Sequence, residues 1–372
     1  MSEPFRALFS GKTVMVTGHT GFKGSWLALW LDYLGANVVG VSLNPPTEPN
    51  HFTSCGMKER VADLRADIRD YDRLTAILGA HQPEIVFHLA AQPIVRHAFA
   101  NPRETFEINV MGTVNLLEAA RKCDMVRAVV VATSDKCYRN VGWEWPYRET
   151  DPLGGNEPYA GSKACAELVV EVYQQERFQA YAAAPRRISV ASGRAGNVIG
   201  GGDWAADRLV PDIARAIAAG RQITLRNPEA TRPWQHVLDC LSGYLHLAAR
   251  LCTEPGRFEE AWNFGPNGAE ALSAADVVAE FLARWPDHAT ELVIERDPPG
   301  KEAQALRVDS SKAAHRLGWR PCWPISDALD ATVAWYRDFA NAPDADMHAL
   351  SVAQIEAFTR AARAAGLPWA AA

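Results

Sequence analysis

The fold of this chain is decided near its start, where residues 13–24 read TVMVTGHTGFKG. The first four residues are apolar or β-branched and predict a short buried strand, and the residues after the loop have the apolar spacing of a helix. A glycine loop between a strand and a helix is the setting that a phosphate-binding turn requires. Gly18 permits the tight turn, Gly21 lets the backbone approach a pyrophosphate, and Gly24 lets helix and strand pack closely. The stretch therefore predicts a dinucleotide-binding unit, although its glycines are spaced GxxGxxG and not GxGxxG.

Further apolar runs alternate with helical patterns through the first half of the chain. The runs expected to be strands cover residues 38–43, 85–89, 128–132 and 188–191, and another strand precedes Ala66. This alternation predicts an α/β fold with a doubly wound parallel sheet of the Rossmann type. We expect a cofactor domain over residues 1–190, with later returns from the C-terminal half, a smaller α/β substrate lobe over residues 191–345, and a helical tail over residues 346–372.

The second half of the chain has shorter elements and is rich in aromatic residues and proline. The expected elements are a helix over residues 211–219 and strands over residues 222–225, 262–265, 291–294 and 305–308. Residues 309–312 are expected to cap a last helical segment. The glycine-rich stretch 193–204 predicts a mobile loop over a ligand. In the first half, a helix expected over residues 104–122 carries Asn109, for which we favour the place of a surface amide.

Polar residues gather where the strand over residues 128–132 ends. The sequence continues with Thr133, Ser134, Asp135 and Lys136, at the sheet edge where open α/β sheets bind their ligands. Tyr159 and Lys163 follow at the start of a helical stretch, four residues apart and so on one face. A turn followed by a solvated helix start would be the ordinary alternative for any of these residues alone. As a set behind a glycine fingerprint, they predict an active site.

The residues expected to bind a dinucleotide surround the same edge of the sheet. Those of the glycine loop are Gly18, His19, Thr20, Gly21, Phe22, Lys23 and Gly24, and those after the later strands are Asn44, Asp67, Ile68, Leu89, Ala90 and Ala91. An acid usually follows the second strand to hold the ribose hydroxyl, but here Ser42 and Leu43 precede Asn44, with neither an acid nor an arginine. We therefore expect NAD and not NADP as cofactor, with its adenosine held loosely.

Charge and cysteine content exclude several classes of protein. The net charge is −6 without a basic block, so neither nucleic acid nor an anionic membrane is an expected partner. The seven cysteines are scattered without a CxxC pair, which predicts free thiols in a reducing compartment and no metal site. No stretch is apolar enough for a membrane span. We expect a cytoplasmic protein.

Together these residues resemble the extended short-chain dehydrogenase/reductase superfamily. The resemblance to the superfamily rests on the glycine loop, on Asp67 with Ile68, on residues 89–91, and on Tyr159 with Lys163. Within the superfamily the chain is similar to the nucleotide-sugar 4,6-dehydratases, most closely the group that acts on CDP-glucose. That similarity rests on residues 42–47, 133–138, 196–204 and 232–236. Relatives that act on dTDP- or GDP-sugars have an Asp-Glu pair where this chain has Asp135 and Lys136.

The resemblance implies a lyase that uses NAD to convert CDP-glucose to CDP-4-dehydro-6-deoxyglucose, a step towards deoxysugars such as those of lipopolysaccharide O-antigens. C4 is oxidised, water leaves from C5 and C6, and the hydride returns to C6. Tyr159 would be the C4 base, with its pKa lowered by Lys163 and the nicotinamide cation. Thr133 would form a hydrogen bond with the C4 oxygen, and a protonated Asp135 would deliver a proton to the leaving hydroxyl. Lys136 would remove the C5 proton or, as the alternative, stay charged and stabilise the enolate.

The resemblance also implies contacts with a nucleotide-diphosphate sugar. The expected substrate residues are Gln92, Ser134, Arg194, Asn197, Leu209, Arg232, Trp234, His236 and Arg307. Arg232 and Arg307 would bind the pyrophosphate, with Asn197 near it, because a guanidinium fork matches phosphate oxygens. A surface salt bridge remains the alternative for each arginine.

Extended members of this superfamily pair through two helices, here residues 104–122 and 159–174. We therefore expect a homodimer through a four-helix bundle, or a tetramer. Two other functions use the same fold. One is a 4-epimerase of a UDP-sugar, which needs no acid and base for elimination, and the other is a redox-sensing protein that binds NAD without catalysis. The retained Asp135, Tyr159 and Lys163 disfavour the second.

Overall fold

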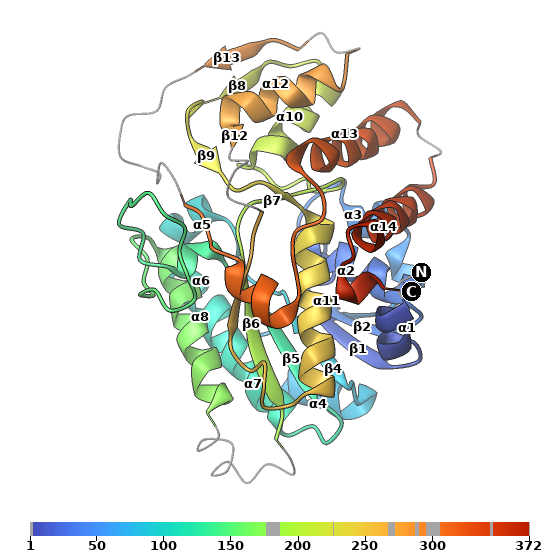
Figure 1. The fold of residues 1–372 in the computed structure, drawn as a ribbon, viewed down its shortest axis with the longest axis vertical. Coiled ribbons are helices and arrows are strands. Elements are labelled where there is room, and N and C mark those ends of the chain that lie inside the picture. Colours follow the sequence, from blue (N-terminus) through green and yellow to red (C-terminus); the bar gives the residue numbers. More distant parts are fainter. Residues whose placement is uncertain are drawn as a thin grey trace.

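Seven parallel strands form a sheet at the centre of the structure, a computed structural model that describes residues 3–175, 187–225, 227–266, 272–286, 290–294, 306–342 and 345–371 (Figure 1). The strand order is β11-β6-β5-β4-β1-β2-β3. The bounds are β1 (Thr13–Thr17), β2 (Asn37–Ser42), β3 (Ala62–Arg65), β4 (Ile85–His88), β5 (Ala128–Ala132), β6 (Ser189–Ala195) and β11 (Ala261–Phe264). The predicted doubly wound parallel sheet is confirmed. The chain reverses its direction of winding between β1 and β4, which is where such sheets bind ligands.

Helices cover both faces of this sheet (Figure 1). One face packs on α4 (Tyr71–His81), α7 (Gly112–Arg121) and α8 (Pro158–Gln174), and the other on α1 (Glu3–Phe9), α2 (Phe22–Tyr33) and α11 (Val237–Thr253). Helix α14 (Met347–Ala364) lies against α2. Helix α2 is consequently buried on all sides from Gly24 to Leu31, because neighbours surround it. The tail predicted to be helical thus belongs to the main core.

The helix predicted over residues 104–122 is present but interrupted. It consists of α6 (Pro102–Phe106), a π-helical turn (Glu107–Met111) and α7. Short helices α3 (His51–Ser54) and α5 (Val95–Ala100) follow β2 and β4. Among the residues that the structure describes, no helix is both long and apolar enough to cross a membrane.

The smaller lobe lies in the upper part of Figure 1. It contains α10 (Leu209–Ala218), α12 (Ala274–Ala283) and two short strand pairs, β8 (Ile223–Leu225) with β13 (Leu292–Ile294) and β9 (Thr231–Arg232) with β12 (Leu272–Ser273). Of the strand expected over residues 305–308, residue 305 lies outside the described part, and Val308 forms an isolated bridge with Tyr147. Residues 309–312 precede a π-helical turn (Ala313–Leu317), and α13 (Ile325–Asn341) follows. Strand β11 and helix α11 return to the main sheet.

The glycine-rich stretch 193–204 differs from its prediction. It begins inside β6, continues through β7 (Val198–Ile199), which pairs with β10 (Gln235–His236), and is mostly buried. The Gly201 carbonyl accepts a hydrogen bond of 2.9 Å from the Trp26 indole, and a Cβ on Gly201 would lie 2.0 Å from the Trp335 ring. These glycines let the backbone approach tryptophan rings. The predicted mobility of this stretch is therefore wrong, because glycine content alone does not distinguish mobility from close packing.

We expect Gly201→Ala to lower the free energy of unfolding by about 1–3 kcal/mol, because the added methyl group overpacks the site against Trp335. Gly79→Ala is the matched control: Gly79 lies in α4 with nothing within 4 Å of an added Cβ. That change should raise stability by about 0.5–1 kcal/mol, because alanine is the better helix former. Urea unfolding of both variants measures the difference, and equal effects would contradict the packing account.

Candidate active site

The loop between β1 and α2 has the shape of a cradle for a diphosphate. Gly18 has a φ of +76°, and a Cβ there would lie 2.7 Å from the Ala90 nitrogen. A Cβ on Gly24 would lie 2.0 Å from the Gly18 carbonyl oxygen. Helix α2 begins after Gly21 without a side-chain cap, so its first N–H groups and its dipole remain for an anion. A side chain at Gly18 or Gly24 would collide with the backbone. The residues present therefore fit a dinucleotide such as NAD, which needs close approach of the backbone.

Two side chains of this loop point into the protein. The His19 imidazole lies 2.8 Å from Asp63 Oδ1 and is fully buried, and burial lowers its pKa. The Thr20 hydroxyl contacts the Ser42 hydroxyl at 2.8 Å. Both residues can therefore contact a cofactor mainly through their backbone. Lys23 lies close to the predicted catalytic residues, because its positive charge lowers the pKa of both Lys163 and Asp135.

Charged residues of the neighbouring strand β3 lie at the end of β2, where residues 42–44 carry no charge. Arg65 of β3 donates to the Leu43 carbonyl at 2.7 Å and pairs with Asp63 at 2.8 Å. This contact could not be predicted from the sequence, because it depends on the strand order that brings β3 beside β2. Asn44 is exposed. Nearby, a hydrogen bond from Arg69 lowers the pKa of Asp67, and Ile68 is buried where a Cβ on Gly112 would lie 2.5 Å from it.

The polar motif after β5 and the start of α8 lie together. Ser134 caps a 3₁₀ turn (Asp135–Cys137), accepting from the Lys136 N–H at 3.2 Å and donating to Asp135 at 3.0 Å. Glu157 caps α8 by accepting from the first N–H groups of the helix. Lys163 then donates to the Ala132 carbonyl at 3.4 Å, and the Lys136 ammonium lies 6.0 Å from the centre of the Tyr159 ring.

Burial favours the neutral forms of three residues that are predicted to be catalytic. Burial raises the pKa of Asp135, against the charges of Lys136, Lys23 and Arg232. Burial lowers the pKa of Lys163 to about 8, with a further contribution from Lys23. For Tyr159, burial raises the pKa to about 12, although a hydrogen bond with Ser134 lowers it. The groups that lower the pKa of Tyr159 are Ser134 and Arg208, and the expected lowering by Lys163 stays a prediction. The other positive charge that is expected to act on the phenol is that of an oxidised nicotinamide.

Arg194, an expected substrate residue, binds other side chains in the interior. Its guanidinium is buried, pairs with Glu167 at 2.7 Å and donates to the Tyr138 hydroxyl at 2.8 Å. It also lies over the Tyr138 ring at 4.9 Å. These contacts hold the guanidinium inside the protein. These contacts give Arg194 a structural role, and its expected contact with the substrate stays a prediction.

Three more predicted substrate residues lie in the interior. His236 is fully buried, accepts from the Leu238 N–H at 3.3 Å at the start of α11, and lies against the ring of Trp323. Trp234 packs in the main core and donates to a backbone carbonyl at 3.3 Å. The Gln92 amide accepts from the Ile94 N–H at 2.6 Å and donates to a threonine at 3.0 Å. These contacts give His236, Trp234 and Gln92 a place in the interior, and their expected contacts with the substrate stay predictions.

The other predicted substrate residues remain partly open. Arg232 is close enough for its charge to act on Asp135. Asn197 and Leu209 are half-buried, beside β7 and at the start of α10. Arg307 donates to the Glu144 carbonyl at 3.0 Å.

Two residues that matter in this site were missed by the sequence analysis. Asn109, expected at the surface, is buried; its amide accepts from the Gln92 N–H at 2.8 Å and donates to the Ser162 hydroxyl at 2.9 Å. It thereby ties the end of β4 to α8, from a π-helical turn that the apolar spacing did not reveal. Glu167 is the second; its only signal was its position four residues after Lys163, on the same helical face.

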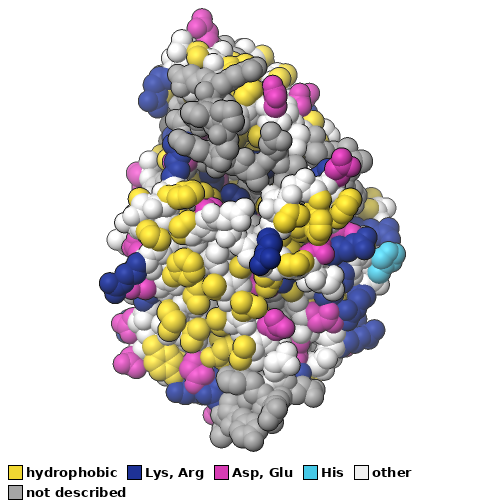
Figure 2. Space-filling view, turned by 90° about the vertical axis from the view of Figure 1, so that its left-hand side faces the viewer, with side chains coloured by type: hydrophobic (Ala, Val, Ile, Leu, Met, Phe, Trp, Pro, Cys, Tyr) yellow, Lys and Arg dark blue, Asp and Glu magenta, His cyan; other side chains and the backbone are white. Residues whose placement is uncertain are grey.

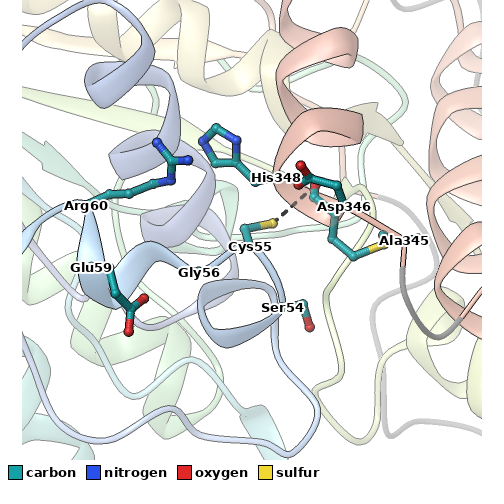
Figure 3. Close-up of a pocket in the computed structure, with 9 residues that line it drawn as sticks. Ser54, Cys55, Gly56, Glu59, Arg60, Ala345, Asp346 and His348 are labelled. Carbon is teal, nitrogen blue, oxygen red and sulfur yellow. Dashed lines mark hydrogen bonds between the residues drawn. The ribbon is translucent and has the colours of Figure 1, made fainter.

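A separate cavity of about 590 Å³ lies between α3 and the start of α14. Figure 3 shows Arg60, His348 and Asp346 around it, and the Cys55 thiol donates to the Met347 carbonyl at 3.5 Å. Burial raises the pKa of Cys55 to about 12, so this thiol is not a nucleophile at neutral pH. None of the lining residues belongs to the predicted active site.

Comparison with known proteins gives matches along most of the chain. Residues 15–332 match the family model described as GDP-mannose 4,6 dehydratase. The chain is 46% identical to a CDP-glucose 4,6-dehydratase of Salmonella typhimurium, over 90% of this chain and 93% of that protein. A dTDP-glucose 4,6-dehydratase from Streptomyces venezuelae, solved with NAD bound, superposes with a TM-score of 0.71 at 25% identity, over 88% of this chain and 97% of that one. A UDP-glucose 4-epimerase from Thermus thermophilus, in complex with NAD, gives 0.72 at 26% identity, over 87% and 99%.

The lowered pKa of Lys163 predicts a pH-dependent stability. The folded value is about 8, against roughly 10.4 in an unfolded chain. Between these values the unfolded state binds more protons, so the free energy of unfolding rises with pH. The Lys163→Met protein buries no charge there and does not share this rise. Its free energy of unfolding relative to that of the wild type should therefore fall by about 2–3 kcal/mol from pH 7 to pH 10.

Urea unfolding at both pH values measures this change, with the exposed Lys58→Met as baseline. A difference between Lys163→Met and the wild type that does not depend on pH would contradict the lowered pKa.

Proposed function

The chain belongs to the family of the GDP-mannose 4,6 dehydratases, and we propose that it converts CDP-glucose to CDP-4-dehydro-6-deoxyglucose. It is an NAD-dependent nucleotide-sugar 4,6-dehydratase, a lyase. The observation that best supports the reaction is the grouping of Asp135, Lys136, Tyr159 and Lys163 at the edge of the sheet, beside the glycine cradle. The proposal of CDP-glucose as substrate comes from the 46% identical relative.

Each of these groups is proposed to have one role in catalysis. When bound, NAD⁺ supplies the acceptor for the C4 hydride and its return to C6, and its positive charge favours the Tyr159 phenolate. Tyr159 takes the proton of the C4 hydroxyl. Asp135, whose pKa is raised by burial, is proposed to donate a proton to the hydroxyl that leaves C6. A 4-epimerase would need no such acid, so a buried carboxyl group at this place favours dehydration.

Lys136 is proposed to remove the C5 proton. It is the residue next to Asp135, and its ammonium group lies over the Tyr159 ring. Once C4 is a ketone the C5 proton is acidic, and some group must accept it. The alternative is a charged Lys136 that stabilises the enolate.

The pyrophosphate is proposed to bind Arg232, with Asn197 and Arg307 nearby. Arg232 acts electrostatically on Asp135, so its charge lies on the reacting side of the lobe. Arginine forks match phosphate oxygens. Arg307 lies beside the segment over residues 138–147, through its contact with Glu144.

The assembly is proposed to be a homodimer. Figure 2 shows an apolar area on the side of the molecule where α5, α6 and α8 lie. Its exposed side chains include Phe99, Phe106, Met111, Leu168 and Val172. Pairing α8 and the helical stretch over residues 104–122 with those of a second copy would bury this area in a four-helix bundle. We also propose a cytoplasmic location, because all seven cysteines are free thiols.

We expect turnover of CDP-glucose in preference to dTDP-, UDP- and GDP-glucose, with one solvent deuterium incorporated at C5 when the reaction runs in D₂O. Deuterium enters because the C5 proton exchanges with a protein base during elimination. Mass spectrometry and NMR of the products measure both. Inversion at C4 without deuterium at C5 would identify an epimerase, and bound NAD without turnover of any nucleotide sugar would contradict catalysis.

Lys136→Met should stop deuterium incorporation at C5 while substrate still reduces bound NAD⁺, seen as absorbance at 340 nm. The reason is that C4 oxidation precedes loss of the C5 proton. Lys58→Met, at an exposed lysine, is the control and should behave as wild type. C5 exchange at close to the wild-type rate in Lys136→Met would exclude Lys136 as the base.

Leu168→Asp should convert the dimer to a monomer, because it places a charge in the proposed bundle. Ile294→Asp is the matched control: both side chains are 52% exposed, but Ile294 lies on β13 in the smaller lobe. Light scattering after size exclusion measures the mass. A dimer that survives Leu168→Asp, or a wild type that is a monomer, would contradict the proposed interface.

A further inference from the structure

A buried carboxylate lies behind the catalytic residues. Glu167 is on α8, one helical turn beyond Lys163, and is 3% exposed. One of its oxygens accepts a hydrogen bond from the Thr133 hydroxyl. The other accepts from the Ser192 hydroxyl at 2.8 Å and from Arg194 at 2.7 Å. The carboxylate therefore joins α8 to the end of β5 and to β6.

The partners of Glu167 determine where the Thr133 proton points. Arginine is always protonated, and an ionised carboxylate can only accept hydrogen bonds. The pair with Arg194 therefore makes Glu167 an acceptor. The next acceptor near the Thr133 hydroxyl is the Gly193 carbonyl at 3.5 Å. Both lie inside the protein, so the hydroxyl proton points inward and the oxygen lone pairs remain for the active site.

We propose that Glu167 is a positioning residue that acts through Thr133. By accepting the Thr133 proton, it fixes the hydroxyl so that Thr133 accepts a hydrogen bond from a hydroxyl group of the bound sugar. This inference rests on the proposed function, because it assigns Thr133 to a sugar held at the edge of the sheet. Thr133 then orients the sugar for oxidation at C4.

A purely structural role for Glu167 would have other consequences. The pair with Arg194 ties α8 to β6, and loss of that tie would loosen the whole site whether or not Thr133 has a hydroxyl. The positioning role predicts that Glu167 matters only while Thr133 is present. Ser192 offers a matched control, because it donates to the same carboxylate but contacts the oxygen that Thr133 does not use.

The experiment is a double-mutant cycle of Thr133→Val and Glu167→Gln, followed with CDP-glucose as substrate. Each single variant should lower kcat by about 10- to 100-fold with KM changed less than about threefold, because misplacement of reacting groups affects the chemical step. In the Thr133→Val protein, adding Glu167→Gln should lower kcat by less than about twofold. Ser192→Ala should keep kcat within about threefold of the wild type.

Glu167→Gln leaves Arg194 buried without its partner, which can prevent folding. The cycle is then repeated with Glu167→Gln and Arg194→Met introduced together, since replacing both charges avoids an unpaired one. Losses of kcat that multiply in either cycle would overturn the proposal and leave a structural role, as would a Ser192→Ala loss equal to that of Glu167→Gln. A wild type that is inactive on every nucleotide sugar would overturn the proposed function, and the inference with it.

Discussion

The buried pair between Arg194 and Glu167 is the interaction on which the active site depends. Removing two charges from water is costly, and attraction offsets that cost only where the geometry is good and further hydrogen bonds are present. Here Ser192, Thr133 and Tyr138 supply those bonds. The pair holds α8, which carries Tyr159 and Lys163, against β6 and the end of β5. Loss of one partner of such a pair costs about 3–5 kcal/mol.

A second constraint is the burial of ionisable side chains at the edge of the sheet. Burial raises the pKa of Asp135 and lowers that of Lys163 to about 8, so it favours the neutral form of each group. Burial also raises the pKa of Tyr159, to about 12. The effect of burial therefore suits an acid at Asp135 but opposes the phenolate that a base at Tyr159 requires. A fixed positive charge beside the ring, such as an oxidised nicotinamide, would couple formation of the base to the redox state of the cofactor.

Much of the fold and part of the site could be predicted from the sequence, because they depend on local patterns. Apolar runs located the strands, and the glycine loop and the motif around Asp135 lie at the strand ends where parallel topology requires them. Contacts between distant segments could not be predicted. Arg194 carries a charge that suits phosphate, but its partner is on α8. Asn109 looked like a surface amide because a π-helical turn redirects it inward, and Arg65 reaches β2 only through strand order.

The central claim is that one hydride leaves C4 and returns to C6 of the same sugar. It is tested most directly with CDP-glucose carrying deuterium at C4, turned over in ordinary water in a mixture with unlabelled substrate. The account predicts deuterium at C6 of the 4-dehydro-6-deoxy product, with labelled product formed only from labelled substrate. Deuterium found again at C4 with inverted configuration, lost to the solvent, or transferred between substrate molecules would contradict it.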